Sequence, residues 1–193
     1  TLNVLLLGFY ASAGEVALFA AAEKLLRFLV RTWEPLNRLF YPQVVRVMQF
    51  DGQNGQVFFV RRLFWSYVAM AFLLIFFMDQ YSDALLLGLL GERFSNSIEL
   101  LHILLLAVPM IAMSNVLGML YLLPTGRDKI FNTIIMSGGF IHLVQSFWLV
   151  QQYGIMGMVL SLLITETLVT VAMLVVVYWL SFKTQHQISY KYE

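Results

Sequence analysis

The sequence predicts an all-α fold, a polytopic membrane helical bundle of about six transmembrane helices. Of its 193 residues, 60% are apolar and 12% are charged, whereas soluble domains have roughly 45–50% and about 25%. The mean hydropathy is +0.78. The apolar residues gather in segments long enough to cross about 30 Å of hydrocarbon as helices. Short connections separate these segments, so most of the chain is expected to lie in the membrane.

The apolar segments follow one another along the chain. The first run, 2–9, is too short to span and has no basic region before it, so we expect a truncated first helix rather than a signal peptide. Leu85 to Leu90 is expected to be a short exterior interfacial segment, because charged residues flank it. We expect one domain, a six-helix bundle over 1–182, and a tail over 183–193. The full segments are 16–45, 57–78, 98–123, 130–150 and 155–180.

The basic residues of the connections lie almost all on one side of the membrane, which predicts the orientation of the helices. Only Arg93 falls on one side of the membrane. Because cytoplasmic loops carry an excess of Lys and Arg, the other side is predicted to be cytoplasmic, and it includes the C-terminal tail. The cytoplasmic set is Arg46, Arg61, Arg62, Arg127, Lys129, Lys183 and Lys191.

Composition also excludes several functions. A net charge of +1 leaves no basic field for nucleic acid. The absence of cysteine removes thiolate chemistry, and three scattered histidines form no metal motif, so we expect no metal and no cofactor. No nucleotide-binding or hydrolase motif is present, so we expect a protein that is not an enzyme.

Six ionisable residues interrupt the 16–45 segment. At about 100° per residue they share one arc of about 100°, and they extend over about 22 Å of a helix. Charged groups at this depth must face a protein interior or water. They are Glu23, Lys24, Arg27, Arg31, Glu34 and Arg38, which we call the charged stripe.

The charged stripe is expected to line a wet cavity. Its pairs at i,i+4 are Glu23 with Arg27 and Glu34 with Arg38, which allows partial neutralisation. Four cations against two anions leave about two positive charges in excess, and arginine binds phosphate oxygens bidentately. The excess therefore suits a diphosphate. The alternative is that carboxylates of this and neighbouring helices neutralise every cation at a polar helix interface.

Three further residues are candidates. Pro35 lies inside the charged stripe and has no amide hydrogen for the carbonyl of Arg31, which permits a hinge. Glu166 lies near the middle of the last segment and is a candidate ion-pair partner or coupling site. His142 is a candidate for the same cavity, and its alternative role is a hydrogen-bonded helix contact.

Short motifs, in order and at similar spacing, resemble the C-terminal half of polysaccharide-biosynthesis flippases. The resemblance covers the whole chain. The matching positions are 17–24, the Leu39-Phe40-Tyr41-Pro42 helix end, the Leu90-Gly91-Glu92-Arg93-Phe94 turn, 100–104, Asn115 to Gly118 with Gly126, and Gly154-Ile155-Met156-Gly157.

The resemblance implies a function. These flippases belong to the multidrug/oligosaccharidyl-lipid/polysaccharide exporter superfamily, have about twelve helices in two bundles, and translocate undecaprenyl-diphosphate-linked oligosaccharides such as O-antigen units. The resemblance implies a multi-pass protein of the bacterial cytoplasmic (inner) membrane. The implied partners are the lipid-linked oligosaccharide, membrane lipids, the N-terminal bundle of the same protein and, as a further candidate, a polysaccharide polymerase.

Two other functions remain open. A MATE-type exporter of organic cations is the nearest alternative, although a cationic stripe repels such cargo. A membrane enzyme subunit that acts on polyprenyl-linked sugars is expected to carry a large exterior loop, and the longest exterior connection here is only 79–97.

Overall fold

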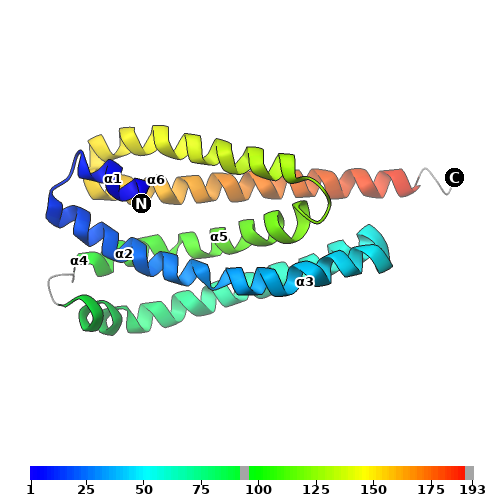
Figure 1. Cartoon of the computed structure of the whole chain (residues 1–193), viewed down its shortest axis with the longest axis horizontal. Coiled ribbons are helices and arrows are strands. Elements are labelled where there is room, and N and C mark those ends of the chain that lie inside the picture. Colours follow the sequence, from blue (N-terminus) through cyan, green and yellow to red (C-terminus); the bar gives the residue numbers. More distant parts are fainter. Residues whose placement is uncertain (92–95, 190–193) are drawn as a thin grey trace.

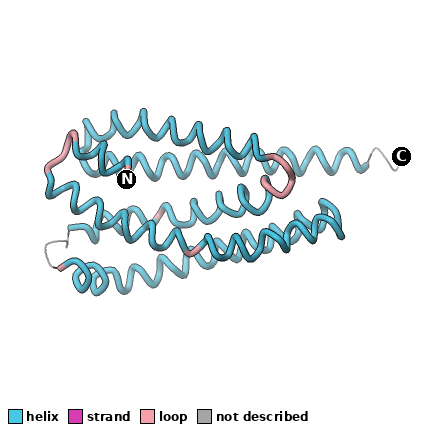
Figure 2. Tube along the Cα trace, in the orientation of Figure 1, coloured by secondary structure: helices cyan, strands magenta, loops and turns pink. Residues whose placement is uncertain are grey.

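The computed structural model describes residues 1–91 and 96–189, and within these ranges every regular element is a helix (Figure 2). This confirms the all-α fold class. Part of the predicted 90–94 turn, with Arg93, and the last residues of the predicted tail, with Lys191, lie outside the described residues. The elements are α1 (Leu2–Gly8), α2 (Ala13–Arg31), α3 (Trp33–Leu90), α4 (Asn96–Leu105), α5 (Ala107–Asn115), the π-helix η2 (Val116–Leu122) and α6 (Asp128–Ser189).

The two longest helices are hairpins. Each contains one glycine with a positive φ, Gly52 at 69° in α3 and Gly154 at 55° in α6. Glycine adopts this backbone region without a steric penalty, so the chain can reverse within one residue. Figure 1 shows the two legs of α3 and the two legs of α6 lying side by side in opposite directions. The legs of α6 are joined by a hydrogen bond from the Gln145 side chain to the Ser161 carbonyl.

The helices fit a membrane. Three stretches among the described residues are long and apolar enough to cross one: Gly55–Ser82, Ser97–Leu122 and Asp128–Leu180. The last of them contains the reversal at Gly154, so it supplies two antiparallel legs. The predicted 85–90 segment continues α3 as helix.

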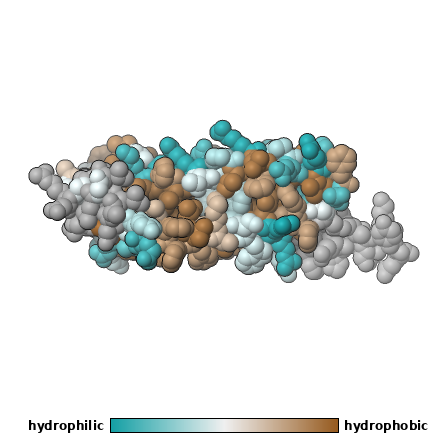
Figure 3. Space-filling model, turned by 90° about the horizontal axis from the view of Figure 1, so that it is seen from below, coloured by the Kyte–Doolittle hydropathy of each residue, from teal (hydrophilic) through white to brown (hydrophobic). Residues whose placement is uncertain are grey.

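The core is shared by all the helices. Leu7 of α1, Trp33 of α3, Leu101 of α4, Leu120 of η2 and Met158 of α6 are each at most 1% exposed and belong to one apolar cluster. The outward surface is also apolar. Figure 3 shows hydrophobic residues over much of the middle of one face, with hydrophilic residues toward the ends and along one edge. An apolar exterior of this kind is suited to lipid.

Two helix breaks lie three residues before a proline. Thr32 separates α2 from α3 ahead of Pro35, and Leu106 separates α4 from α5 ahead of Pro109. Proline has no amide hydrogen and its ring crowds the preceding turn. At Thr32 the amide hydrogen and the hydroxyl both donate to the Leu29 carbonyl, at 3.1 and 2.6 Å. The break predicted from Pro35 therefore lies within the charged stripe, between Arg31 and Glu34.

The start of α2 is fixed by a capping box outside the membrane segments. The Ser12 hydroxyl accepts from the Glu15 amide, and the Glu15 carboxylate accepts from the amide and hydroxyl of Ser12, both at 2.8 Å. These bonds, the one from the backbone amide first, lower the pKa of Glu15. Such a box satisfies amides that have no partner within the helix.

The close approach of the two α6 legs gives a stability prediction. A methyl group on Gly138 would lie 2.5 Å from a Val169 methyl, whereas one on the adjacent Gly139 would meet nothing within 4 Å. We expect Gly138→Ala to destabilise the full protein in detergent by about 1–3 kcal/mol through overpacking. Gly139→Ala is the matched control, because it makes the same change in helix propensity without the clash. Equal thermal midpoints for the two variants would contradict this packing.

Candidate functional site

Two neighbouring cavities lie among the helices and carry most of the predicted residues. The first has a volume of about 480 Å³, and the second about 560 Å³. Asn115, at the end of α5, lines both. The polar residues that line the first cavity are Asn3, Glu23, Arg27, Ser114, Asn115, His142, Thr165 and Glu166. The second is lined by Glu34, Asn37, Arg38, Tyr41, Asn115 and Met119.

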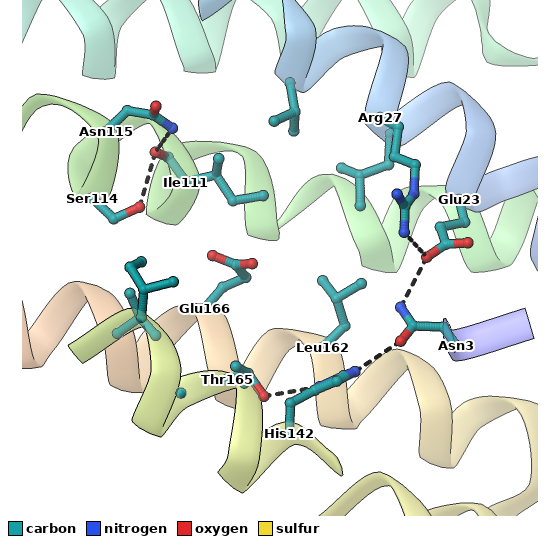
Figure 4. Close-up of a pocket in the computed structure, with 16 residues that line it drawn as sticks. Asn3, Glu23, Arg27, Ile111, Ser114, Asn115, His142, Leu162, Thr165 and Glu166 are labelled. Atoms are coloured by element: carbon teal, nitrogen blue, oxygen red, sulfur yellow. Dashed lines mark hydrogen bonds and ion pairs between the residues drawn. The ribbon is translucent and has the colours of Figure 1, made fainter. Parts of the chain in front are cut away.

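Glu23 of α2 is a buried anion of the first cavity that three side chains hydrogen-bond. Its side chain is 3% exposed. One carboxylate oxygen accepts from Arg27 and from the Asn3 amide, each at 2.8 Å, and the other accepts from the Thr1 hydroxyl at 2.7 Å. Arg27 is 51% exposed and reaches toward the cavity (Figure 4). The predicted i,i+4 pair Glu23 with Arg27 is therefore formed, with its anion buried and its cation accessible.

His142, on the first leg of α6, joins the same polar chain. Its Nε2 lies 2.9 Å from the Asn3 side-chain oxygen, and its Nδ1 lies 3.0 Å from the Thr165 hydroxyl and 3.2 Å from the Ser161 hydroxyl. Thr165 and Ser161 belong to the second leg of α6. The imidazole thus bridges the two legs of α6 and reaches α1 through Asn3, as Figure 4 shows.

Glu166 points into the first cavity between α5 and α6 (Figure 4). Among the described residues it has neither an ion pair nor a hydrogen bond. No arginine of the charged stripe pairs with it in this structure. A carboxylate in such a place is available to a ligand or a proton that enters the cavity.

The rest of the charged stripe is exposed and unpaired. Glu34 and Arg38 line the second cavity, while Lys24 and Arg31 line neither cavity. Within the part of the chain that the structure describes, none of these four residues forms an ion pair. The predicted Glu34 with Arg38 pair is absent there. Among the described residues, the cations Lys24, Arg31 and Arg38 therefore have no carboxylate partner.

A buried amide cluster separates the cavities. The Asn37 side chain donates to the Asn115 side-chain oxygen at 3.0 Å and accepts from the Tyr67 hydroxyl at 3.0 Å. Asn115 in turn donates to the Ile111 carbonyl at 2.8 Å. Trp33 stacks on Tyr67 with ring centroids 5.0 Å apart. This cluster joins both legs of α3 to α5 where α5 passes into the π-helix.

Sequence reasoning missed Asn3, Asn37, Asn115 and Tyr67 as site residues. A signal was present for Asn37, since it lies one residue from Arg38 and about 40° outside the arc that the charged stripe occupies. A lone asparagine in the apolar run 2–9 is also unusual for a residue facing lipid, which marks Asn3. Tyr67 gave no comparable signal.

Comparison with known proteins identifies relatives over most of the chain. A protein of Shigella dysenteriae named "Putative O-antigen transporter" is 32% identical over 172 residues, which are 89% of this chain and 42% of the relative. A protein of the same name from Escherichia coli (strain K12) is 27% identical over 175 residues, 90% of this chain and 42% of the relative. No family model matches the chain. No solved structure matches it.

These relatives confirm the resemblance to flippase-type proteins that the sequence motifs predicted. The chain spans about two fifths of the length of the curated relatives that it matches. The similarity therefore applies to a part of those proteins that is close to one half.

The amide cluster gives a second prediction. Asn115→Ala leaves the buried Asn37 amide without its acceptor, which we expect to cost about 1–3 kcal/mol of unfolding free energy. Ser114→Ala is the matched control, because among the described residues the Ser114 hydroxyl bonds to the Ile111 carbonyl of its own helix and to no member of the cluster. Thermal unfolding of the full protein in detergent measures both. If Ser114→Ala lowered the unfolding free energy as much as Asn115→Ala, the amide cluster would not be the source of the stability.

Proposed function

We propose that this chain is one bundle of a transporter that translocates undecaprenyl-diphosphate-linked oligosaccharide units, such as O-antigen repeats, across the bacterial cytoplasmic membrane. The observation that carries the proposal is the pair of exposed arginines at the two cavities, Arg27 and Arg38, in a chain related to proteins named as O-antigen transporters. The curated names support transport, and the cavity chemistry supports the kind of cargo.

The cations suit a diphosphate linked to sugars. Arg27 at the first cavity and Arg38 at the second are exposed arginines, and the two cavities share Asn115. Guanidinium groups bind phosphate oxygens with paired, charge-assisted hydrogen bonds. In the proposal Lys24 and Arg31 add to the field that attracts the anion, Glu23 and Glu34 tune it, and the lipid tail stays in the bilayer. Organic cations, the cargo of MATE-type exporters, are repelled by the same field.

The remaining wall of the cavity is assigned to a second bundle of the same protein. Transporters of this general kind bind substrate between two repeats and alternate its access. Residues 1–182 then form the C-terminal six-helix bundle, and 183–193 form a cytoplasmic tail. The break at Thr32, ahead of Pro35, is proposed as a hinge of this motion. Glu166 and His142 are proposed as the coupling groups, and a polysaccharide polymerase is a candidate partner.

Complementation of surface polysaccharide synthesis tests the site. We expect Arg27→Ala and Arg38→Ala in the full protein to lower transport about ten- to a hundred-fold, because each removes a charged hydrogen bond worth about 1.5–3 kcal/mol. Arg62→Ala is the matched control, since Arg62 is an exposed arginine that lines neither cavity.

Protein levels in the membrane must be equal for this comparison. Full activity of both cavity variants would remove the arginines from the mechanism. An oligosaccharide polymerase or ligase product made by the purified protein would favour the membrane enzyme alternative instead.

The orientation has its own test, because the chain contributes no cysteine of its own. We expect a thiol introduced as Asp51→Cys to react with an impermeant maleimide only from the cytoplasmic side, and one introduced as Tyr81→Cys only from outside. Both positions are exposed, and they lie near the opposite ends of the apolar span Gly55–Ser82. Any other cysteine of the full protein is first replaced. Reaction of both thiols from one side would contradict the proposed topology.

A further inference from the structure

A continuous chain of hydrogen bonds runs from the accessible guanidinium of Arg27 to the imidazole of His142. It passes from Arg27 to the Glu23 carboxylate at 2.8 Å, from there to the Asn3 amide at 2.8 Å, and from Asn3 to His142 at 2.9 Å. The four residues come from three helices, since Asn3 is in α1, Glu23 and Arg27 are in α2, and His142 is in α6. His142 of α6 is thereby connected to Arg27, the group proposed to bind phosphate.

The direction of each hydrogen bond in this chain is fixed. A carboxylate only accepts hydrogen bonds, so the Asn3 NH₂ group must face Glu23. The Asn3 oxygen therefore faces His142, and the Nε2 of His142 must carry a hydrogen. The other nitrogen, Nδ1, faces the hydroxyls of Thr165 and Ser161. A hydroxyl can donate to a bare nitrogen or accept from a protonated one, so both charge states of His142 keep their hydrogen bonds.

Three charged groups face His142 from the elements around it. Glu23 lies beyond Asn3, Arg27 lies beyond Glu23, and Glu166 of the second α6 leg lines the same cavity. The other polar groups at the ring, from α1 and α6, are uncharged. The α5 residues of the cavity, Ser114 and Asn115, are also uncharged. Removing Arg27 from Glu23 would leave two carboxylates without a cation near the imidazole.

We propose that His142 is a positioning residue that acts through Asn3 and Glu23, and that its protonation releases Arg27 from Glu23 for a diphosphate. This deepens the proposed function and rests on it. When Arg27 turns to the ligand, Glu23 loses its nearest cation, and a protonated His142 supplies the missing positive charge. The Asn3 amide connects Glu23 to His142. Hydrogen bonds in such a chain strengthen one another in a low dielectric, so a change at one end affects the other.

The proposal requires proton uptake when the ligand binds. Linkage is reciprocal, so a proton that favours the ligand must itself be favoured by the ligand. Affinity for the diphosphate therefore rises as pH falls through the titration of His142. One linked proton limits this change to about tenfold per pH unit.

Binding of farnesyl diphosphate to the full protein in detergent, measured from pH 5.5 to 8.5, tests this. His142→Gln keeps a donor toward Asn3 and an acceptor toward Thr165 but does not titrate. The matched control is His102→Gln, since His102 is a histidine of α4 that contacts Ser82 and Asp79 instead. The ligand and the detergent are the same throughout, so ionisation of the diphosphate itself cancels in the comparison.

We expect the affinity of the unaltered protein and of His102→Gln to change more steeply with pH than that of His142→Gln. The difference is at most about tenfold per pH unit, the limit for one linked proton. We also expect Arg27→Gln to abolish the difference, since the proton then has no arginine to release. Binding by His142→Gln with an unchanged pH slope overturns the inference and leaves the proposed function standing. No binding by the unaltered protein at any pH overturns both.

Discussion

The carboxylate of Glu23 is the group around which the first cavity is built, because an ionised oxygen pair buried among apolar helices must have its hydrogen bonds supplied by protein. Partners from α1 and from α2 itself supply three of them. Through Asn3 the same carboxylate is tied to α6. Breaking such a set by removing one partner leaves a buried charge uncompensated, which is far more costly than the net value of the pair. One buried side chain therefore links three helices that also share the apolar core.

Two of the four prolines follow a helix break, whereas Pro42 lies inside α3 without one. Pro35 and Pro109 each follow a break by three residues, and the break at Thr32 lies between Val30, which lines the first cavity, and Glu34, which lines the second. The π-helix η2 begins at the residue after Asn115, which lines both cavities. Wider helical turns of this kind often occur at functional sites because they rotate the side chains that follow. Asn115, which bonds to Asn37, thus lies at the point where regular helix gives way to the π-helix.

Much of the fold was accessible from the sequence. The apolar segments correspond to helices, since length and hydropathy dominate in a membrane, and Glu23 pairs with Arg27 as the i,i+4 spacing predicts. The Glu34 with Arg38 pair failed to appear among the described ion pairs. Both residues lie in α3, beyond the break at Thr32, and both are exposed, so their spacing permits the pair while solvent competes with it. Spacing alone also could not show that His142 meets Asn3, because 139 residues separate them.

The hairpin at Gly52 has a consequence for how the protein enters the membrane. The charge-bearing helix that precedes it, α2 with the first leg of α3, is not among the stretches apolar enough to cross on their own, whereas Gly55–Ser82 is. Charged residues near the centre of a segment oppose its transfer from the translocon to lipid by about 2.5–3.5 kcal/mol each. The first leg therefore depends on the second for its insertion. The two legs are therefore expected to leave the translocon together. The tight turn at Gly52 keeps the apolar leg next to the charged one.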